Sequence, residues 1–409
     1  MSDNDSYTET TSTSWFSRLG SSFGGIGAGI VLFIAATALL YWNEGRAVRT
    51  GDAIAEAQLA TVPLPSISEA DPAFDGKTVY ATGRAVTKDI VTDPEFGVQV
   101  NAIRLNRRVE FYQWTQQSKS ETQKKLGGGE ETVTTYTYSR KWVSSPVDSQ
   151  NFKKPAGHEN TVRVQTDSQK FTAENVTFGA YRLPGFLVKS ISGEKPLPLN
   201  MTEEQRADLQ RKLFSPDPNP SAQSAGGPTS MVHSQGNTLY FGRNPSEPRV
   251  GDVRITFTEV PQDDISIIAT VAGRTFKQFR ASNGNTFSKL SMGVRDMNVM
   301  FDDAKSSNSI MTWVLRLAGL LLCIGGLRMI LDPLQILADV VPLIGSLVGL
   351  GTSLVAGVLG TAWSLLVVAF SWIRFRPVLG ACLLGAALLL CAALFLRARS
   401  RKKAAPARS

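Results

Sequence analysis

The chain has 409 residues, a net charge of +8 and three cysteines. This length exceeds one typical domain, so we expect a membrane part together with one or two soluble modules. Residues 43–309 hold 32 Lys and Arg against 30 Asp and Glu, a balance that excludes the basic stripe of a nucleic-acid-binding protein. Cys323, Cys382 and Cys391 all lie in apolar carboxy-terminal runs. Their position excludes a disulfide framework or a cysteine zinc site in residues 43–309.

The first apolar run covers residues 24–42 and contains no charged residue. It is long enough to cross a bilayer core of about 30 Å. The polar residues 1–23 before it contain three acids and one base, Arg18, and no small-residue cleavage site follows the run. This pattern is typical of a retained signal anchor rather than a cleaved signal peptide. We therefore predict a polar amino-terminal tail followed by a first transmembrane helix.

Three further spans are predicted near the carboxy terminus. The second covers residues 310–331, the third residues 346–373 and the fourth residues 378–396. Residues 332–345 contain two prolines and are expected to lie at the membrane interface. A five-span alternative remains open, in which the long run 340–373 breaks at its glycines.

Four spans place both termini on one side of the membrane and residues 43–309 on the other. Close to the spans, the terminal side carries eight Lys and Arg and the domain side carries six. The positive-inside rule therefore favours cytosolic termini and an exoplasmic domain. Residues 397–409 form a basic cytosolic tail, whose cations we expect to meet anionic lipid headgroups. The tail cations singled out are Arg397, Arg399, Arg401, Lys402 and Lys403.

Residues 43–309 are predicted to be rich in β-strands, because β-branched and aromatic residues alternate with polar ones. The predicted strands are 77–86, 108–115, 131–143, 237–243, 250–260 and 265–279. The glycine-rich stretch "KKLGGGEE" joins the second and third of these strands, which we expect to form a long hairpin. The sequence thus predicts an α+β multi-pass membrane protein. It has one amino-terminal and three carboxy-terminal transmembrane helices, with a large β-rich domain between the first and the second.

One helix of this region has a recognisable start. Thr202 and Gln205 have the spacing of a capping box, and Leu209 and Leu213 share one helical face. The segment that follows, about 215–236, is rich in Pro, Ser and Gly. It is predicted to be a disordered insertion.

The sequence offers few candidates for catalysis. It contains two histidines, His158 and His233, and it lacks HExxH, a Walker loop and GxSxG. The glycine-rich residues 24–29 lie inside an apolar span with no strand before them, which excludes a nucleotide-binding loop. We therefore predict no enzyme activity, no cofactor and no metal. A membrane-surface enzyme that uses His158 with Glu159 is kept as an alternative.

Charged residues at the spans are better candidates, because charges in a membrane are costly and usually partnered. Glu44 follows the first span and Arg316 lies early in the second, both on the domain side. We predict that their side chains pair. The competing partner of Arg316 is lipid phosphate, reached by snorkelling. Arg328 and Asp332 are four residues apart and are expected to pair near the cytosolic face.

The residues around the first pair form a predicted assembly joint at the membrane face. Its members are Trp42, Asn43, Glu44, Gly45, Arg46, Trp313 and Arg316. Trp42 is expected to anchor the interface. Arg46 and Arg49 are expected to contact solvent or headgroups. Within the third span, Gly345, Gly349 and Gly357 are predicted to allow close helix packing, within one chain or between chains.

Seven blocks of the sequence stand out together. They are "WNEGRAVRT" (42–50), "DPEFGVQVNAIRLNRRVEFYQW" (93–114), "YTYSRKW" (136–142), "NFKKPAGHEN" (151–160), "PRVGDVRITF" (248–257), "NSIMTWVLRLAG" (308–319) and "FRP" (375–377). In this order they resemble the LUMA family, also called the transmembrane protein 43 family. The insertion near 215–236 departs from the vertebrate members, in which it is shorter.

The resemblance implies a four-span membrane protein with a large exoplasmic domain between the first two spans. Vertebrate members reside in the endoplasmic reticulum and the inner nuclear membrane. The family also occurs in bacteria, so the bacterial inner membrane is the alternative location. The resemblance further implies a scaffold of membrane protein complexes that self-associates, and it implies no enzyme activity.

We therefore expect a non-enzymatic integral membrane scaffold that organises membrane protein complexes. Its expected partners are the lipid bilayer, other membrane proteins and further copies of itself in a homo-oligomer, but no nucleic acid. The first alternative is a channel or transport component that uses Arg316, Arg328 and the glycine-rich third span. The second alternative is the enzyme built on His158.

Overall fold

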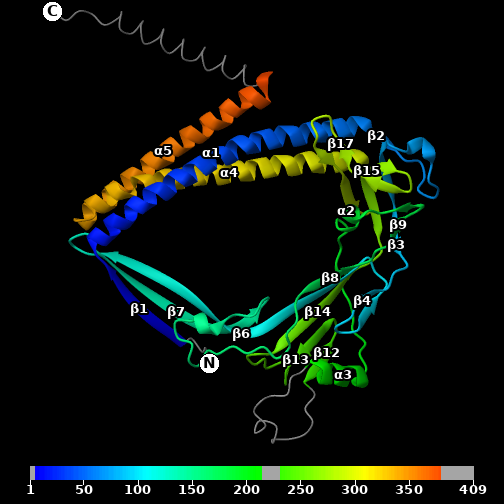
Figure 1. Ribbon diagram of the computed structural model, residues 1–409, viewed down its shortest axis with the longest axis horizontal. Helices are drawn as coiled ribbons and strands as arrows, with labels where there is room; N and C mark the ends of the chain where they lie inside the picture. Colours follow the sequence, from blue (N-terminus) through cyan, green and yellow to red (C-terminus); the bar gives the residue numbers. More distant parts are fainter. Residues whose placement is uncertain (1–4, 214–230, 379–409) are drawn as a thin grey trace, which may run out of the picture.

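The computed structural model describes residues 5–213 and 231–378 of the chain. Three long helices lie side by side in an elongated layer, and two β-sheets lie on one side of it (Figure 1). The layer and the sheets are joined at both ends of the helices. The fold is therefore α+β, as predicted. The predicted fourth span, 378–396, and the basic tail, 397–409, lie outside the described residues, apart from Val378.

The three membrane helices are α1 (Trp15–Ala60), α4 (Met297–Ala338) and α5 (Pro342–Phe375). Each is long and apolar enough to cross a membrane. Ser14 caps α1, because its hydroxyl accepts a hydrogen bond from the Ser17 amide at 3.3 Å. α1 then continues well past residue 42, where the predicted span ends. At roughly 1.5 Å per residue the helix measures about 69 Å, far more than the thickness of a bilayer core.

The last turns of α1 pack on the domain. Ile54 and Ala57 of α1 meet Met300 and Phe301 of α4 over Ile268 of the smaller sheet, and all five residues are buried. Burial of apolar surface at this point fixes where both helices leave the domain.

The connection between α4 and α5 differs from the predicted interfacial segment 332–345. α4 continues through Pro333 to its end, and α5 begins at Pro342 after the turn 339–341. Proline suits the first turn of a helix, because its missing amide proton would have no partner there. α5 runs for 34 residues without interruption. The alternative in which 340–373 breaks at its glycines is therefore wrong.

Glycines let the three helices approach closely. A Cβ placed on Gly29 of α1 would lie 2.7 Å from the carbonyl oxygen of Gly326 in α4. A Cβ on Gly360 of α5 would lie 2.7 Å from the side chain of Ile324 in α4. These contacts define an antiparallel pair, α1 with α4, and a second one, α4 with α5.

Two of the three glycines predicted to pack helices do so. Gly345 and Gly349 face α4, where a side chain would collide with Asp339 and Gln335. Gly357 has no neighbouring atom within 4 Å of an added Cβ. It makes no helix contact within the described chain, so the within-chain prediction fails at this residue.

The larger sheet has eight strands. In spatial order, six of them are β1 (Asp5–Thr13), β7 (Glu130–Val143), β6 (Arg104–Lys124), β14 (Val253–Val260), β13 (Thr238–Phe241) and β12 (Val232–Gln235). The other two are β11 (Lys195–Pro196), which pairs with β14, and β8 (Gln169–Thr172), which pairs with β6. All pairings in this sheet are antiparallel.

The smaller sheet has seven strands. In spatial order they are β19 (Lys289–Met292), β15 (Asp264–Ala272), β16 (Thr275–Lys277), β10 (Tyr181–Arg182), β9 (Val176–Phe178), β3 (Thr78–Thr87) and β2 (Thr61–Pro63). β15 also pairs with β3, and two pairings are parallel, β2 with β3 and β10 with β16. Two-stranded ribbons are formed by β4 (Val91–Asp93) with β5 (Val98–Val100) and by β17 (Phe279–Arg280) with β18 (Thr286–Phe287).

The main hydrophobic core lies between the two sheets. It includes Val109 and Phe257 from the larger sheet and Val79 and Ile267 from the smaller one, all fully buried. Every predicted strand overlaps an observed one. The predicted strand 265–279 is divided in the structure into β15, β16 and the first residue of β17. The chain turns between β15 and β16 at Gly273, whose φ of +61° favours glycine.

The predicted hairpin of β6 and β7 is confirmed, and a third strand extends it. β7 pairs with β6 along its whole length and with β1 from Tyr138 to Glu130. The sequence predicts the polar residues 1–23 as a tail on the opposite side of the membrane from the domain. Residues 5–13 instead form the edge strand of the domain's larger sheet. Their threonines suit a strand, and they cover the edge that β7 would otherwise leave open.

The predicted capped helix is confirmed as α3 (Glu203–Leu213). The Gln205 amide donates to the Thr202 hydroxyl at 3.2 Å, and the Thr202 amide donates to the Gln205 side chain at 2.9 Å. Most of the predicted insertion lies outside the described residues, but its end, 232–235, forms β12. The remaining short elements are α2 (Gly185–Val188) and 3₁₀ turns at Pro72–Phe74 and Ser149–Asn151.

Candidate functional site

Glu44 and Arg316 form the centre of a polar site among the three membrane helices, close to the domain. Both carboxylate oxygens of the fully buried Glu44 accept hydrogen bonds from Arg316, from Nε at 2.6 Å and from Nη2 at 2.8 Å. Trp372 of α5 donates its indole N–H to the same carboxylate at 2.8 Å. The predicted pair is therefore confirmed, and it includes a third helix that the sequence did not indicate. We define the proximal joint as Glu44, Arg316 and Trp372 together with Asn43, Gly45 and Arg46.

Arg316 is held by aromatic rings as well as by the carboxylate. Its guanidinium carbon lies 4.8 Å from the ring centre of Trp313 and 5.7 Å from that of Trp372. A bidentate carboxylate and two π-faces satisfy the charge of a guanidinium within the protein. This arrangement replaces the competing expectation, in which Arg316 would reach lipid phosphate.

Asn43 and Arg46 extend the joint along α4. The side-chain amide of Asn43 donates to the Thr312 carbonyl oxygen at 3.0 Å. Arg46 donates to the side chains of Asn308 at 3.0 Å and Thr312 at 2.9 Å. The expectation that Arg46 contacts solvent or headgroups is therefore wrong. Arg49 is exposed and donates to the carbonyl oxygen of Gly45 at 3.2 Å.

Gly45 is part of the joint because of its size. A Cβ at this position would lie 2.7 Å from the ring of Phe375, so α1 and α5 can approach only at a glycine. Trp42 and Trp313 are exposed on the outside of the helix layer. That position suits tryptophan side chains at a membrane interface.

A second polar site, which the sequence did not indicate, lies at the other end of the helices. Asp339 is fully buried at the end of α4 and forms ion pairs with Arg18 of α1 and Lys124 of β6, each at 2.7 Å. Arg18 also contacts Glu130 of β7 at 2.7 Å, and Trp15 donates to the Ile336 carbonyl oxygen at 2.8 Å. We call Trp15, Arg18, Lys124, Glu130 and Asp339 the distal joint.

The distal joint fixes the tip of the β6–β7 hairpin to the helix layer. Arg18 donates to the Gly128 carbonyl oxygen at 2.5 Å, and the Gly127 amide donates to the Val340 carbonyl oxygen at 3.1 Å. Gly127 and Gly128 have φ of +88° and +80°, a turn conformation that favours glycine. Asp339, one of two acids in the apolar carboxy-terminal region, was the available signal for a partnered charge.

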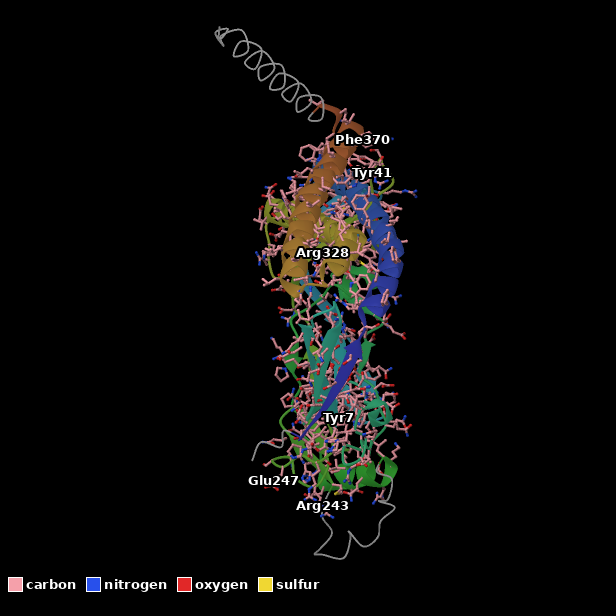
Figure 2. All side chains as sticks on the ribbon, turned by 90° about the vertical axis from the view of Figure 1, so that its left-hand side faces the viewer. Tyr7, Tyr41, Arg243, Glu247, Arg328 and Phe370 are labelled. Atoms are coloured by element: carbon pink, nitrogen blue, oxygen red, sulfur yellow. The ribbon has the colours of Figure 1, made fainter. Side chains whose placement is uncertain are left out.

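Arg328, labelled in Figure 2, joins α4 to α5 on the side of the layer nearer the distal joint. It donates to the Gly349 carbonyl oxygen at 2.5 Å and to the Thr352 hydroxyl at 2.9 Å, and it also contacts Ser353 and Gln335. The predicted pair with Asp332 is not among the ion pairs of the described chain. Backbone and hydroxyl acceptors of the neighbouring helix satisfy the guanidinium in its place.

A polar cavity of about 510 Å³ lies beside the distal joint. Its lining includes Arg18, Arg328, Asp332 and Gln335. The first two of these side chains are already bonded within the protein, so the cavity borders the joint rather than forming a separate cluster of free charges.

His158, the residue of the enzyme alternative, is enclosed by aromatic rings. It is 1% exposed, stacks on Tyr138 with ring centres 4.0 Å apart, and meets Trp114 edge-on at 4.8 Å. Its Nδ1 lies 2.9 Å from the Lys154 carbonyl oxygen and its Nε2 lies 3.3 Å from Asp5 of β1. The imidazole therefore ties β1 to the domain from a buried position.

A hydrogen-bonded group around Asp252 is a further polar contact of the domain. Asp252 is buried and accepts hydrogen bonds from the Tyr240 hydroxyl at 2.6 Å and the Arg249 amide at 2.8 Å. Burial and the neighbouring Asp252 carboxylate raise the pKa of Tyr240 above its usual range. The second histidine, His233, lies 3.1 Å from the Gly242 carbonyl oxygen. No group of three or more metal-ligating side chains occurs within residues 5–213 and 231–378.

Known proteins resemble this chain over most of its length. The family model for transmembrane protein 43 matches residues 111–377. Transmembrane protein 43 of Rattus norvegicus is 30% identical over 389 residues, which cover 92% of this chain and 89% of the relative. The Homo sapiens protein of that name is 28% identical over 91% of this chain and 90% of the relative. The homolog in Drosophila melanogaster is 29% identical over 87% and 90%.

No solved structure matches the chain. The three apolar helices and the relatives together identify an integral, multi-pass membrane protein. The family model covers more than half of the chain, and the relatives match almost its whole length. The chain therefore belongs to the transmembrane protein 43 family, the LUMA family.

Proposed function

We propose that this protein is a non-enzymatic membrane scaffold that organises other membrane proteins. The proposal rests on one observation: the charged side chains at the ends of the membrane helices form ion pairs within the two joints. Glu44 and Arg316 connect three helices beside the domain, and Arg18 and Asp339 connect two helices with the hairpin tip. The proximal joint thereby fixes the three helices to one another beside the domain, as a platform for other proteins requires.

The same contacts disfavour a channel. A polar path across the membrane needs charged side chains that face water or a permeating ion. Arg316 is bound to Glu44 between two tryptophans, and Arg328 is bonded to Gly349 and Thr352 of the neighbouring helix. Both arginines therefore hold helices together. The burial of His158 likewise argues against the enzyme alternative.

Self-association is supported by small residues that face outward. Added Cβ atoms at Gly20, Gly24, Gly27 and Gly357 would meet nothing within 4 Å. Gly20, Gly24 and Gly27 have the spacing of one helix face. Small residues on an open face let a second membrane helix approach closely.

The proposed location is a bacterial inner membrane or the endoplasmic reticulum and inner nuclear membrane, as the resemblance to the LUMA family implies. The domain is proposed to be exoplasmic and the basic carboxy-terminal tail cytosolic, on the charge balance around the spans.

Cross-linking in native membranes, followed by mass spectrometry, tests the scaffold. We expect recurrent links to a small set of membrane proteins and links between copies of this chain. In a variant carrying Gly20→Ile and Gly24→Ile, the links between copies are expected to fall, while Gly185→Ala in α2 of the domain leaves them unchanged. The scaffold proposal would be rejected if the cross-links occur only within single chains and liposomes that hold the purified protein conduct ions. The channel alternative would then explain the results.

A further inference from the structure

An apolar groove of about 650 Å³ lies between α1 and α5. Its walls include Phe33, Ile34 and Tyr41 of α1 and Leu366, Val367 and Phe370 of α5. Figure 2 shows Tyr41 and Phe370 close together near the carboxy-terminal end of α5.

Two polar side chains in the groove wall have partners within the protein. The Trp363 indole N–H donates to the Thr37 hydroxyl at 2.9 Å, and that hydroxyl donates to the Phe33 carbonyl oxygen at 2.8 Å. Apart from the Tyr41 hydroxyl, the surface left to an occupant is hydrocarbon. The groove also lies beside residues 24–42, the charge-free part of α1, so it faces the apolar core of the membrane.

Two arginines, Arg49 and Arg374, lie near the end of the groove beside the proximal joint. Arg374 follows Phe370 by one helical turn, and Arg49 follows Ala38 by three turns, so each lies on the groove-facing side of its helix. The two helices meet between them, where Gly45 faces Phe375. Both arginines are exposed, and neither belongs to an ion pair within the described chain.

We propose that this groove binds one phospholipid, with an acyl chain along α1 and α5 and the phosphate between Arg49 and Arg374. Arginine binds phosphate through paired N–H donors and a full positive charge. An acyl chain fills apolar surface that would otherwise lack close contacts. A phospholipid joins these two chemistries in one molecule, with its phosphate at the level of the proximal joint.

Charge favours a phospholipid over residues 379–396 of the chain as the occupant of the groove. Residues 379–396 contain no Asp or Glu. Their packing into the groove would leave both arginines without a counter-charge, whereas a phosphate supplies it. The bound lipid would link α1 and α5 beside Glu44, on the side of the membrane where the domain leaves the helices.

A photo-cross-link at Leu366 tests the occupant. Leu366→p-benzoylphenylalanine places the reactive group in the groove, and Leu365→p-benzoylphenylalanine is the control. The two leucines are almost equally exposed, at 63% and 65%, but only Leu366 lines the groove. After purification of the full chain in detergent, irradiation is expected to add the mass of one phospholipid at position 366 and none at 365, where lipid exchanges freely.

Other products of the same irradiation would overturn the proposal. A link from position 366 to a peptide within 379–396 would make the chain's own segment the occupant, and a link between two chains would make it a second copy. Equal lipid adducts at 366 and 365, or none at either position, would show that no lipid is held in the groove.

Phosphorus content gives a second measurement that needs no photo-reactive residue. Arg49→Gln and Arg374→Gln are each expected to weaken the affinity for phospholipid about tenfold. Less phospholipid per chain should then remain after detergent purification. Arg108→Gln, at an exposed position on β6, is the matched charge control. Retention that is unchanged in both groove variants, with elution from a sizing column as for the parent protein, would contradict the phosphate contact.

Discussion

Glu44 lies fully buried among α1, α4 and α5, and its carboxylate receives two bonds from Arg316 and one from Trp372. The sequence was sufficient to predict the ion pair, because a charge at a span end needs a partner at the same depth. It could not identify Trp372, since the angle at which α5 crosses α1 is decided by packing. Arg46 was predicted as solvated for a similar reason. Its partners lie on α4, more than 260 positions away in the sequence.

Gly45 offers a test of the joint at a single residue. Gly45→Ala places a methyl group against Phe375, and overpacking of this kind costs about 1–3 kcal/mol of unfolding free energy. We expect a lower thermal midpoint for Gly45→Ala in detergent. Phe375→Leu in the same chain should restore most of the loss, because it removes the ring that the methyl group meets.

The control for this substitution is Gly357→Ala on the open face of α5. It should leave the midpoint unchanged or raise it slightly, because alanine favours a helix more than glycine does. An equal loss at both glycines would mean that helix propensity, and not the contact with Phe375, governs Gly45.

At the scale of elements, the strands and helices were largely predictable, and their ends were not. Hydrophobic alternation located β3, β6, β7, β14 and β15, and apolar runs located α1, α4 and α5. Each membrane helix continues beyond its predicted bounds, because polar turns that leave the bilayer can remain helical when they pack on the domain. The strand β1 escaped prediction, since its polar sequence forms a strand only against the edge of β7.

Paired cysteines test whether β1 and β7 pair in the membrane. Thr8 lies opposite Thr135 in the ladder, and the natural cysteines all lie in apolar carboxy-terminal runs. Thr8→Cys with Thr135→Cys is expected to form a disulfide on mild oxidation in native membranes, because opposite residues have a Cα separation that suits one.

The control shifts one cysteine along the same strand. Thr132 lies opposite Thr11, so Thr8→Cys with Thr132→Cys should cross-link poorly. Equal cross-linking of both pairs, or none in either, would exclude the observed register.

The distal joint makes a prediction about the hairpin tip. Asp339→Asn leaves Arg18 and Lys124 without their buried carboxylate, a change that typically costs about 3–5 kcal/mol. We expect faster backbone hydrogen exchange at Gly127 and Gly128, which the joint holds against α4. Asp332→Asn, seven positions earlier on α4, is the control, and exchange that rises equally in both variants would disprove a specific role for Asp339.

At the scale of the whole molecule, the helices and the sheets are joined at two places about 39 Å apart along α1, from Arg18 to Glu44. The outer half of the β-ribbon that reaches Arg18 is polar on both faces. An open-edged polar ribbon does not lie in hydrocarbon. The β1–β7 ladder and an amino terminus on the side opposite to the domain therefore exclude each other. Charge counting could not reveal this, because it treats each loop as independent of the others.

The central claim is that the buried pair of Glu44 and Arg316 fixes the membrane helices to one another beside the domain. Its most direct test is the thermal midpoint of the charge-swapped protein in a membrane mimetic. Glu44→Arg and Arg316→Glu are each expected to lower the midpoint sharply, because each leaves two like charges buried together. The double swap should recover most of that loss by restoring an ion pair. A double swap no more stable than either single variant would contradict the claim.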